Sequence, residues 1–503
     1  MKSILLSFSF FLFSFTLIAQ PSLDWDRIPD SLSHSYPNCQ KVITDHNGDI
    51  YVLADKLYKY DQHGTLIWAL TDSLAGYVDL LTDNVGGLYL CGQTPDSVTK
   101  GVVSKYSASG VLAWRRIDTF ASSTLKSITL AVPYLYTTGK QIVPGIGNSI
   151  LIEGYDTSGQ LNWTKTDRVN NVESEATQIT VFGFYLYVCG NYLYDASNFI
   201  YSGFVSTYDI SGHNSWIDTT NFVYQLPIGI TLDRIPDLYI SVDQYITGSS
   251  SLLTKLDKND NLLWVENKIV TIGTSPATIK QSVLDNKQNV IIFGSAGGGV
   301  CYPNQIDPIS QAFLSRVRPN GDTVFSYYSP YCGGVYSCAI QDDNHIVALL
   351  SGRIDTTAEL VSFDSTGHIH WTIAMPFKRS YGHITIDSGK NIILGMTSSY
   401  QGQSTSFVET RKYGTNIINS INEISTSTHI EVYPNPTKDF ITIQSNGDNI
   451  DEAVLMDMSL QLVSSQQIKA AQYKINVEGF AKGVYFLELK TQTETSWYKI
   501  VID

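Results

Sequence analysis

The chain has few charged residues, fewer of them basic than acidic, and it has few long apolar runs. Only 16% of its 503 residues are charged, and 33 Lys and Arg stand against 47 Asp and Glu, a formal net charge of −14. Nucleic-acid binding requires a clustered basic surface, so no nucleic-acid partner is expected. The longest apolar run, Ile4 to Ile18, is shorter than the ~20 residues of a membrane-spanning helix, so no transmembrane segment is expected.

Motifs for metals, cofactors and catalysis are also missing. The nine histidines form no zinc pattern such as H-E-x-x-H. The oxygen-rich segments 45–49 and 257–261 lack the length and the final Glu of an EF-hand loop, and turn chemistry explains them. No G-x-S-x-G elbow marks a hydrolase. We therefore expect no cofactor and no metal, and the sequence identifies no catalytic residue.

The first twenty residues have the pattern of a secretory signal peptide. Met1-Lys2 carries a minimal positive charge, the apolar run follows, and Ala19 offers a small residue for cleavage. Residues 1–20 are therefore predicted to be a signal peptide.

A repeat with a spacing of about fifty residues fills most of the chain. Each unit has a short polar turn followed by a large aromatic residue. It appears as KYDQHGTLIW (59–68), KYSASGVLAW (105–114), GYDTSGQLNW (154–163), TYDISGHNSW (207–216), KLDKNDNLLW (255–264), RVRPNGDTVF (316–325) and SFDSTGHIHW (362–371). A second motif precedes each of these, as in ITDHNGDIYVLA (43–54) and LLTDNVGGLYLCG (80–92).

The chemistry of the repeat predicts the blades of a β-propeller. In the turn 61–64, Asp61 binds the turn backbone and Gly64 takes a positive φ, which closes a hairpin. Leu66 and Trp68 are two residues apart, so they point to the same face of a strand. Short strands without any helical period are typical of a propeller. We therefore predict an all-β fold, with a β-propeller over residues 21–417 followed by a small C-terminal β-sandwich.

Eight blades are predicted, and seven remain the alternative if one divergent unit is not a blade. Eight inner-strand motifs are present when SITLAVPYLYTTG (127–139) is counted. The last unit, FVETRKYGT (407–415), stops where its outer strand should begin. The segment 22–25 (SLDW) is similar to the outer strand 161–163 (LNW), so we expect it to complete the last blade and to close the ring.

The repeats resemble the Trp-docking repeats of pyrroloquinoline-quinone-like propellers and also SBBP-type repeats. The resemblance covers roughly residues 22 to 417 and implies that one large aromatic residue per unit docks neighbouring blades. These residues are Trp25, Trp68, Trp114, Trp163, Trp216, Trp264, Phe325 and Trp371. A quinoprotein would also need calcium ligands, a catalytic carboxylate and residues that stack on the quinone, and no local motif supplies them.

Six cysteines in an exported chain permit disulfides. Cys91 and Cys189 occupy equivalent positions in separate repeats, so they are expected to lie too far apart to pair and to remain free. Cys301, Cys332 and Cys338 are close in sequence and allow one local bridge, for example from Cys332 to Cys338.

Residues 430–503 have the pattern of several short strands. Ile441 and Ile443 alternate with polar or aromatic neighbours. Pro434 and Pro436 flank Asn435 and cannot donate ladder hydrogen bonds, so they mark a strand exit and turn. Residues 418–429, polar and rich in Ser and Thr, are predicted to be the linker into this domain.

This tail closely resembles the C-terminal sorting domain of the type IX (Por) secretion system of Bacteroidetes. The resemblance rests on YPNP (433–436), GVY (483–485) and KIV (499–501). The corresponding sorting-motif residues are Pro434, Asn435, Pro436, Gly483, Tyr485 and Lys499. Met458-Ser459 stands where a glycine is usual, and the chain ends on acidic Asp503. The resemblance implies export through the periplasm by the type IX secretion machinery, to the cell surface or the medium.

The sequence favours a binding or scaffold role over catalysis, without deciding the question. Three long inserts, 295–310, 191–202 and 398–406, are candidates for the binding surface, because propellers bind through loops on one face. Their Tyr, Asn and Gln suit a glycan or protein ligand. The alternative is an extracellular polysaccharide hydrolase or lyase with a site in the propeller funnel. Two carboxylates converging there would favour the enzyme.

Overall fold

The computed structural model divides the chain into two units, residues 1–415 and 416–503, which we describe separately. The structure describes residues 21–28, 39–83, 85–120, 122–219, 222, 225–234, 237–244, 253–266, 278–296, 311–342, 345–351, 358–375, 378–399, 406–414, 430–445, 449–457, 462–491 and 495–503. The predicted signal peptide and linker lie outside these ranges. Within them, no helix is long and apolar enough to cross a membrane.

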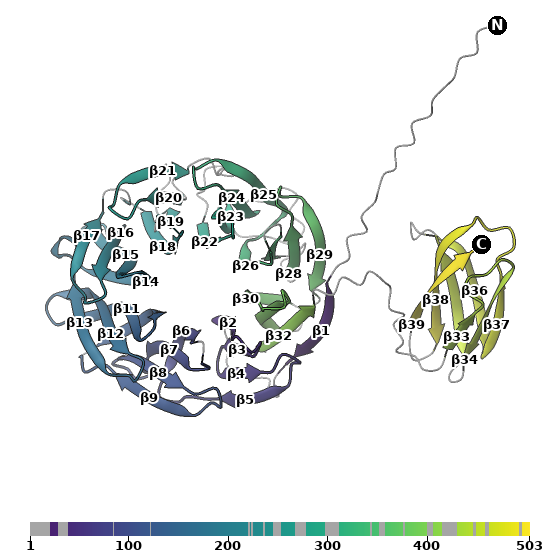
Figure 1. Cartoon of the computed structure of the whole chain (residues 1–503), viewed down its shortest axis with the longest axis horizontal. Helices are drawn as coiled ribbons and strands as arrows, with labels where there is room; N and C mark the ends of the chain where they lie inside the picture. The colour runs from purple at the N-terminus through teal and green to yellow at the C-terminus, as the bar shows by residue number, and fades with distance from the viewer. Residues whose placement is uncertain are drawn as a thin grey trace, which may run out of the picture. The chain divides into compact units, whose positions relative to one another are not determined.

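In its described part, the first unit contains eight antiparallel four-stranded sheets arranged as a ring, with the first strand of each sheet innermost (Figure 1). This confirms the all-β propeller and the reading of eight blades. The outermost strand of the last blade comes from the N-terminal part of the chain.

The strands are given blade by blade, from the innermost strand outward. Blades 1 to 4 are β2 (Lys41–Thr44), β3 (Ile50–Leu53), β4 (Leu57–Tyr60), β5 (Leu66–Leu70); β6 (Gly76–Thr82), β7 (Leu88–Gln93), β8 (Gly101–Tyr106), β9 (Leu112–Ile117); β10 (Ser123–Ala131), β11 (Tyr134–Val143), β12 (Gly147–Asp156), β13 (Leu161–Asp167); and β14 (Ser174–Phe182), β15 (Tyr185–Asp195), β16 (Ile200–Asp209), β17 (Asn214–Asp218). A 3-10 turn, η1 (Val169–Asn171), joins blades 3 and 4. Blades 5 to 8 are β18 (Gln225–Leu232), β19 (Leu238–Gln244), β20 (Leu253–Leu256), β21 (Leu262–Glu266); β22 (Thr278–Leu284), β23 (Val290–Ala296), β24 (Gln311–Val317), β25 (Thr323–Cys332); β26 (Val335–Ile340), β27 (Ile346–Ser351), β28 (Ala358–Phe363), β29 (Ile369–Met375); and β30 (Lys378–Ile386), β31 (Ile392–Ser399), β32 (Ser406–Gly414), β1 (Ser22–Arg27).

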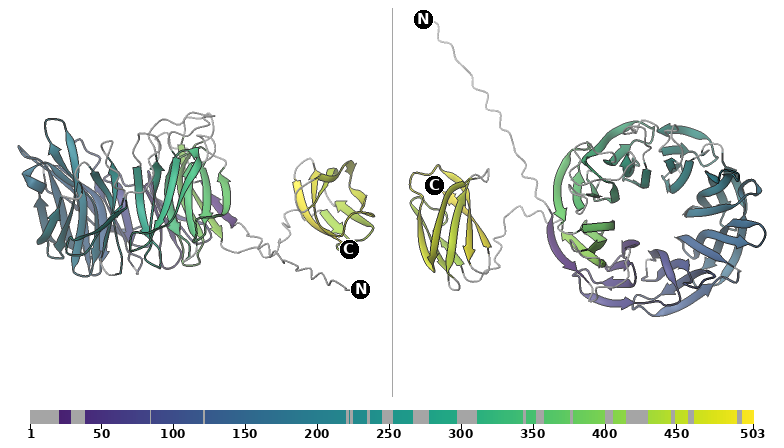
Figure 2. Two further views of the ribbon diagram at one scale, coloured as in Figure 1. Left: turned by 90° about the horizontal axis from the view of Figure 1, so that it is seen from above. Right: turned by 180° about the vertical axis from the view of Figure 1, so that it is seen from behind.

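The N-terminal strand closes the ring, as predicted. β1 pairs antiparallel with β32, with Leu23 opposite Tyr413 and Trp25 opposite Lys412. The innermost strands β2 and β30 also contact each other. Without β1, the edge of β32 would present unpaired backbone groups to solvent, so the closing strand removes an open edge. Seen from the side, the strands run roughly along the ring axis (Figure 2).

The core lies between blades, because each sheet packs on both of its faces. The second strands are therefore apolar almost throughout; every residue of β3 is buried, and so are Val290 to Phe293 in β23. In the junction between blades 6 and 7, Phe293 packs with Ala348 and Phe363. Burying one such large apolar side chain stabilises the fold by roughly 1.5–3 kcal/mol. The second strands alternate little because both faces of each sheet are buried.

A belt of hydrogen bonds joins the inner strands around the ring axis. In most of these strands a register shift, a β-bulge, precedes a polar residue. A bulge re-aims the side chain that follows it. In four described junctions this side chain accepts the backbone N–H of an isoleucine in the following blade: Ile128 to Asp79 (3.1 Å), Ile179 to Ser127 (3.4 Å), Ile230 to Gln178 (2.9 Å) and Ile384 to Ser337 (3.2 Å).

Four cysteines of the described ring are buried thiols. Cys91 and Cys189 are free, as predicted, and so are Cys39 and Cys338. The expected local bridge between Cys332 and Cys338 is therefore wrong. Cys338 packs among apolar side chains between blades 6 and 7, where its burial raises the pKa of the thiol and makes it a small apolar residue.

The second unit is a β-sandwich of two antiparallel sheets in its described part. One sheet has the order β33 (Ile430–Tyr433), β34 (Phe440–Ser445), β37 (Gln472–Asn476). The other has the order β36 (Leu462–Ala470), β35 (Ile450–Met456), β38 (Gly483–Thr491), β39 (Thr495–Ile502). Ile441 and Ile443 are fully buried, and their neighbours along β34 are less so, as the alternation predicts. Their partners in the core include Leu455 and Leu487.

Candidate functional site

The two ends of the ring carry different connections. Within each blade, the turns from first to second strand and from third to fourth strand lie at one end, which we call the turn end. The connections from second to third strand and from blade to blade lie at the other, the loop end. All three sequence inserts belong to the loop end. Residues 297–310 and 400–405 lie outside the described residues, whereas the third insert forms the tip of the β15–β16 hairpin.

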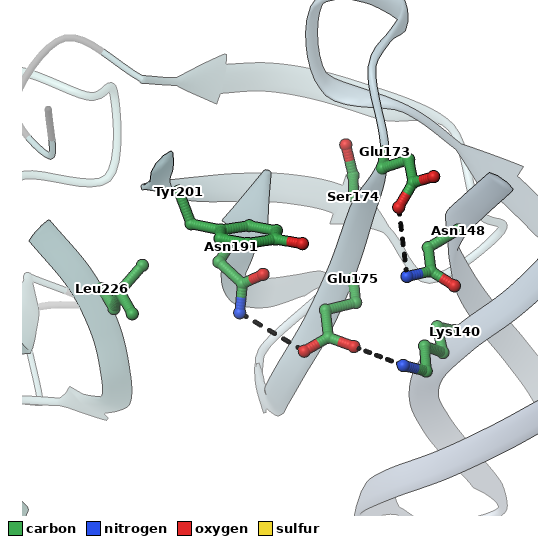
Figure 3. A pocket seen from close by; sticks show the side chains of 8 residues that line it. All are labelled: Lys140, Asn148, Glu173, Ser174, Glu175, Asn191, Tyr201 and Leu226. Carbon is green, nitrogen blue, oxygen red and sulfur yellow. Dashed lines mark hydrogen bonds and ion pairs between the residues drawn. The ribbon is translucent and has the colours of Figure 1, made fainter. Parts of the chain in front are cut away.

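A pocket of about 310 Å³ lies at the loop end across blades 3, 4 and 5 (Figure 3). It forms because the β11–β12 and β15–β16 hairpins are long, so their ends stand above the crossing from blade 3 to blade 4. Its lining is mostly polar and consists of Lys140, Asn148, Glu173, Ser174, Glu175, Asn191, Tyr201 and Leu226.

Glu175 is the central charge of this pocket, and its charge is balanced. Lys126 and Lys140 of blade 3 reach its two carboxylate oxygens at 2.9 and 3.0 Å. Asn191 donates to it at 3.4 Å. Burial by itself would raise the pKa of Glu175, but the hydrogen bonds and charges of the two lysines outweigh it and hold the pKa below its usual value. Glu175 is therefore ionised and suited to accepting hydrogen bonds, not to donating a proton.

The opposite wall of the pocket includes the segment that connects blade 3 to blade 4. Arg168 donates to the carbonyl oxygens of Val172 and Ile146, both at 3.2 Å, and so ties this segment to the β11–β12 hairpin. Glu173 then accepts a hydrogen bond of 3.5 Å from Asn148. Carboxylate and amide groups thus line this wall, as Figure 3 shows.

Tyr201 and Leu226 supply the apolar part of the pocket. Both are partly buried, and both belong to the side of the pocket facing blade 5 (Figure 3). A pocket with amides, balanced carboxylates and one aromatic side can bind a polar, hydroxyl-rich ligand. Sequence reasoning pointed to the insert that carries Tyr201, but not to Lys140 or Glu175, because nothing local distinguishes them.

Two further carboxyl groups, which do not line this pocket, meet between blades 2 and 3. Asp118 follows β9 and Glu153 lies in β12; both are buried, and Tyr155 donates to Glu153 at 2.7 Å. Burial, and next the charge of Asp118, raise the pKa of Glu153 to about 8. Burial also raises the pKa of Asp118. The pair therefore shares a proton at neutral pH. At 2% exposure Glu153 cannot reach a ligand.

The aromatic residues predicted to dock the blades lie at the blade junctions of the turn end. Six indole N–H groups donate to a backbone carbonyl in the outer turn of the following blade: Trp25 to Gln62 (3.3 Å), Trp68 to Ala108 (3.1 Å), Trp114 to Thr157 (3.2 Å), Trp163 to Ile210 (3.0 Å), Trp216 to Lys258 (3.4 Å) and Trp264 to Pro319 (2.9 Å). Phe325 packs against Gly367 of the next turn. Trp371 is buried with Met375 and Tyr413.

Sequence reasoning missed a basic residue at most of these junctions. In four blades a lysine donates to the same backbone carbonyl as the indole of that blade's tryptophan; these are Lys59, Lys105, Lys255 and Lys412. In blade 6, Arg316 donates to the matching turn carbonyl of the following blade. Each also pairs with a carboxylate of its own blade. The signal was present, because these residues occupy one fixed position of the repeat.

The sorting-motif residues come together at one edge of the sandwich. Asn435, between Pro434 and Pro436, accepts the backbone N–H of Val501 at 2.8 Å. In the adjoining pair of strands, Gly483 lies opposite Ile502, and Lys499 lies opposite Phe486. The Tyr485 hydroxyl donates to the carbonyl of Ala481 at 2.7 Å. Three sequence motifs far apart in the tail thus form one contiguous structure.

Comparisons with known proteins identify the tail and the fold of the ring. Residues 431–503 match the family described as the secretion system C-terminal sorting domain. No curated protein matches the chain. Among solved structures, the Dos1 propeller is similar at 12% identity and a TM-score of 0.50, over 79% of this chain and 96% of that one.

Two other similar structures have lower TM-scores. PorZ, a bacterial surface component of the type IX secretion system of Porphyromonas gingivalis, has 10% identity and a TM-score of 0.34, over 93% of this chain and 75% of that one. The WD40 domain of SCAP from fission yeast has 11% identity and a TM-score of 0.43, over 78% and 99%. Sequence identities as low as these do not indicate a shared function. The sorting domain, in contrast, marks this chain as a protein exported by type IX secretion to the cell surface or the medium.

Proposed function

We propose that this exported propeller is a glycan-binding module whose ligand occupies the loop-end pocket of blades 3 to 5. The observation that carries the proposal is the pairing of Glu175 with Lys126 and Lys140. It leaves a polar pocket with balanced charge, which suits the hydroxyl groups of a neutral sugar. Tyr201 adds an aromatic ring that can pack on a sugar ring.

The domain plan fits delivery outside the cell. We infer a signal peptide at 1–20, a ring at 21–417, a linker at 418–429 and a sorting domain at 430–503. The type IX machinery is the partner that reads the last of these. In this plan the tail determines the destination and the ring determines what is bound there.

The same pocket argues against the alternative of a polysaccharide hydrolase. Glycoside hydrolysis needs one carboxylic acid that donates a proton and a second carboxylate across the bond. Glu175 is held ionised by two lysines, so it does not supply the acid. The buried pair of Asp118 and Glu153 has the raised pKa values but no access to substrate.

The mature full-length protein tests the proposal on a glycan array, followed by calorimetry with the best oligosaccharide. Tyr201→Ala and Asn191→Ala are each expected to weaken binding about tenfold, because each removes a direct contact. Tyr194→Ala is the matched control, since Tyr194 is 46% exposed on the same hairpin but does not line the pocket. Binding that both pocket variants leave unchanged, or release of shortened products, would refute the proposal.

Export is tested separately by deleting residues 430–503. The truncated chain is expected to stay in the periplasm with its ring folded, because the two units have separate cores. Fractionation with protease protection measures this. Arrival of the truncated chain in the medium would show that the tail is not the sorting signal.

A further inference from the structure

In blades 3 and 4 the turns between the first and second strands, which lie at the turn end, expose apolar side chains. In blade 3 the turn between β10 and β11 exposes Val132 (71%) and Tyr134 (41%). In blade 4 the turn between β14 and β15 exposes Phe184 (74%) and Tyr185 (48%). Contiguous exposed aromatic and aliphatic groups are unusual on a protein surface and mark interaction sites.

The corresponding turns of the other blades are closed by carboxylates. In blade 1, Asp45 accepts the backbone N–H groups of Asn47 and Asp49 at 2.9 and 3.0 Å. Asp83, Asp233, Asp285, Asp342 and Asp387 cap the matching turns of blades 2, 5, 6, 7 and 8. Blades 3 and 4 have instead two-residue turns, since Ala131 pairs with Tyr134 and Phe182 pairs with Tyr185.

The basic residue of the junction is also absent from these two blades, as it is from blade 7, where Ser362 lies opposite Trp371. Gly154 and Thr207 stand where blades 1, 2 and 5 have Lys59, Lys105 and Lys255. The carboxylate and the cation are therefore absent together, and in neighbouring blades. The inner turns of these two blades therefore have no charge pair, whereas their outer turns keep the carboxylates of Asp156 and Asp209.

A pocket of about 270 Å³ opens beside the replaced lysine position. Its walls are aromatic: Tyr134 and Tyr136 lie on one strand, and the Trp163 ring lies 6.0 Å from that of Tyr136. The exposed side chains of Asn162 and Ser211 stand at its rim. No Asp, Glu, Lys, Arg or His lines it.

The pocket and the exposed turns form one surface. Trp163 donates to the carbonyl of Ile210, and the N–H of Ile210 donates to the carbonyl of Phe184 at 3.1 Å. Ile210 therefore connects the pocket wall to the exposed turn of blade 4. We call Val132, Tyr134, Trp163, Phe184, Tyr185 and Ile210 the aromatic turn surface.

We propose that the aromatic turn surface binds an uncharged, proline-rich segment of a partner protein in the extended polyproline conformation. Pyrrolidine rings pack on aromatic side chains, and aromatic-lined grooves are the usual sites for such segments. A polyproline segment has free carbonyl groups, which the Asn162 amide and the Ser211 hydroxyl at the rim can meet as donors. The lining has no charge to pair with, so a charged segment would be desolvated without compensation.

Val132 and Phe184 favour a protein over a sugar at this end. They are the two most exposed apolar tips of the surface and have no polar atom on their side chains, so a sugar hydroxyl gains nothing from them. The inference is independent of the proposed glycan site, which lies at the opposite end of the ring. A protein with both sites would bridge a glycan and a partner protein.

Calorimetric titration of the full mature protein with acetylated, amidated decaproline tests the inference. Saturable binding is expected, and Tyr134→Ser and Phe184→Ser should each weaken it about tenfold, as loss of an aromatic anchor does. Phe199→Ser is the matched control, because Phe199 is equally exposed, at 72%, but lies at the loop end of blade 4. It should leave peptide binding unchanged. A Gly-Ser peptide of the same length should not bind.

Four results would overturn the inference. Decaproline could fail to bind at millimolar concentration, or bind equally well to Tyr134→Ser and Phe184→Ser. Maltohexaose or cellohexaose could bind in its place with sensitivity to these two variants, which would make this a sugar site. Light scattering could show a dimer that Phe184→Ser dissociates, which would make a second copy of the chain the occupant. Loss of glycan binding at the loop end would bear only on the proposed function.

Discussion

Blades 1 and 3 dock their neighbours with different chemistry around the same hydrogen bond. In blade 1, the Trp68 indole and the Lys59 ammonium both donate to the carbonyl of Ala108, at 3.1 and 3.0 Å. Lys59 also pairs with Asp49 at 2.7 Å. In blade 3, Trp163 alone donates to the corresponding carbonyl, that of Ile210.

The difference shows which part of the junction these two blades share. The indole-to-carbonyl bond is present in both kinds of junction, whereas the ion pair is present in one. Docking therefore depends on the aromatic residue, and the charged groups are an addition that blades 3 and 4 replace with an apolar surface. Four predictions sharpen this comparison, and three of them have a control variant.

The largest effect is expected from breaking a charged junction. In blade 5, Lys255 pairs with Asp237 at 2.9 Å and Asp233 at 3.5 Å, and it is almost fully buried. Lys255→Met leaves two carboxylates without their cation, so we expect the free energy of unfolding to fall by about 3 kcal/mol. Urea unfolding measures it. Thr207→Ser at the matching site of blade 4 should have little effect, and an equal loss there would erase the distinction between the junctions.

A smaller loss is expected where a turn glycine meets the docking tryptophan. A Cβ at Gly159 would lie 2.5 Å from the Trp114 ring, and its φ is +86°. Gly159→Ala should therefore cost about 2–3 kcal/mol through strain and overpacking. Gly183→Ala, at φ +58° with no atom near its Cβ, carries the strain alone and should cost about 1 kcal/mol. Equal thermal shifts for the two variants would mean that the ring contact contributes nothing.

The carboxyl pair beside blade 3 predicts a gain in stability that depends on pH. The pKa of Glu153 is raised to about 8 in the folded state. The unfolded chain releases this proton at much lower pH, so the pair destabilises the fold increasingly as pH rises towards 8, and not at pH 4. Glu153→Gln removes this cost and should stabilise the protein at pH 8 by on the order of 1–2 kcal/mol.

Glu175→Gln serves as the opposite control for the carboxyl pair. The pKa of Glu175 is lowered, so its ion pairs stabilise the fold above its unfolded pKa and are lost on acidification. This variant should be most destabilised at pH 8, and progressively less so as the pH falls below the unfolded pKa towards the lowered folded pKa of Glu175. Unfolding midpoints across this range that move in the same direction for both variants would contradict the assignment of the two carboxyls.

The smallest effect is expected from the aromatic turn surface. Phe184 is 74% exposed, so Phe184→Ser should change the free energy of unfolding by less than about 0.5 kcal/mol. Thermal unfolding measures this. A loss comparable to that of Lys255→Met would mean that the apolar turns stabilise the ring instead of serving as a contact surface.

Local patterns were enough to predict most of the fold. The blade count and the closing strand followed from one motif per unit, because alternation and turn chemistry act within about ten residues. The tail was recognisable for the same reason, as its three motifs are short. Even the junction lysines were visible at a fixed repeat position, although their role was not.

The sequence by itself thus determined the architecture of this protein and its destination. The tertiary structure alone decided which side chains meet. Glu175 and Lys140 are brought together by the crossing between blades 3 and 4, and Glu153 and Asp118 by the packing of blades 2 and 3. Such contacts depend on the position of a residue around the ring and on the ends of neighbouring hairpins. Neither the position around the ring nor the ends of neighbouring hairpins can be deduced from the spacing of residues along the chain. Charge balance, shared protons and pockets can therefore be identified only in the closed ring.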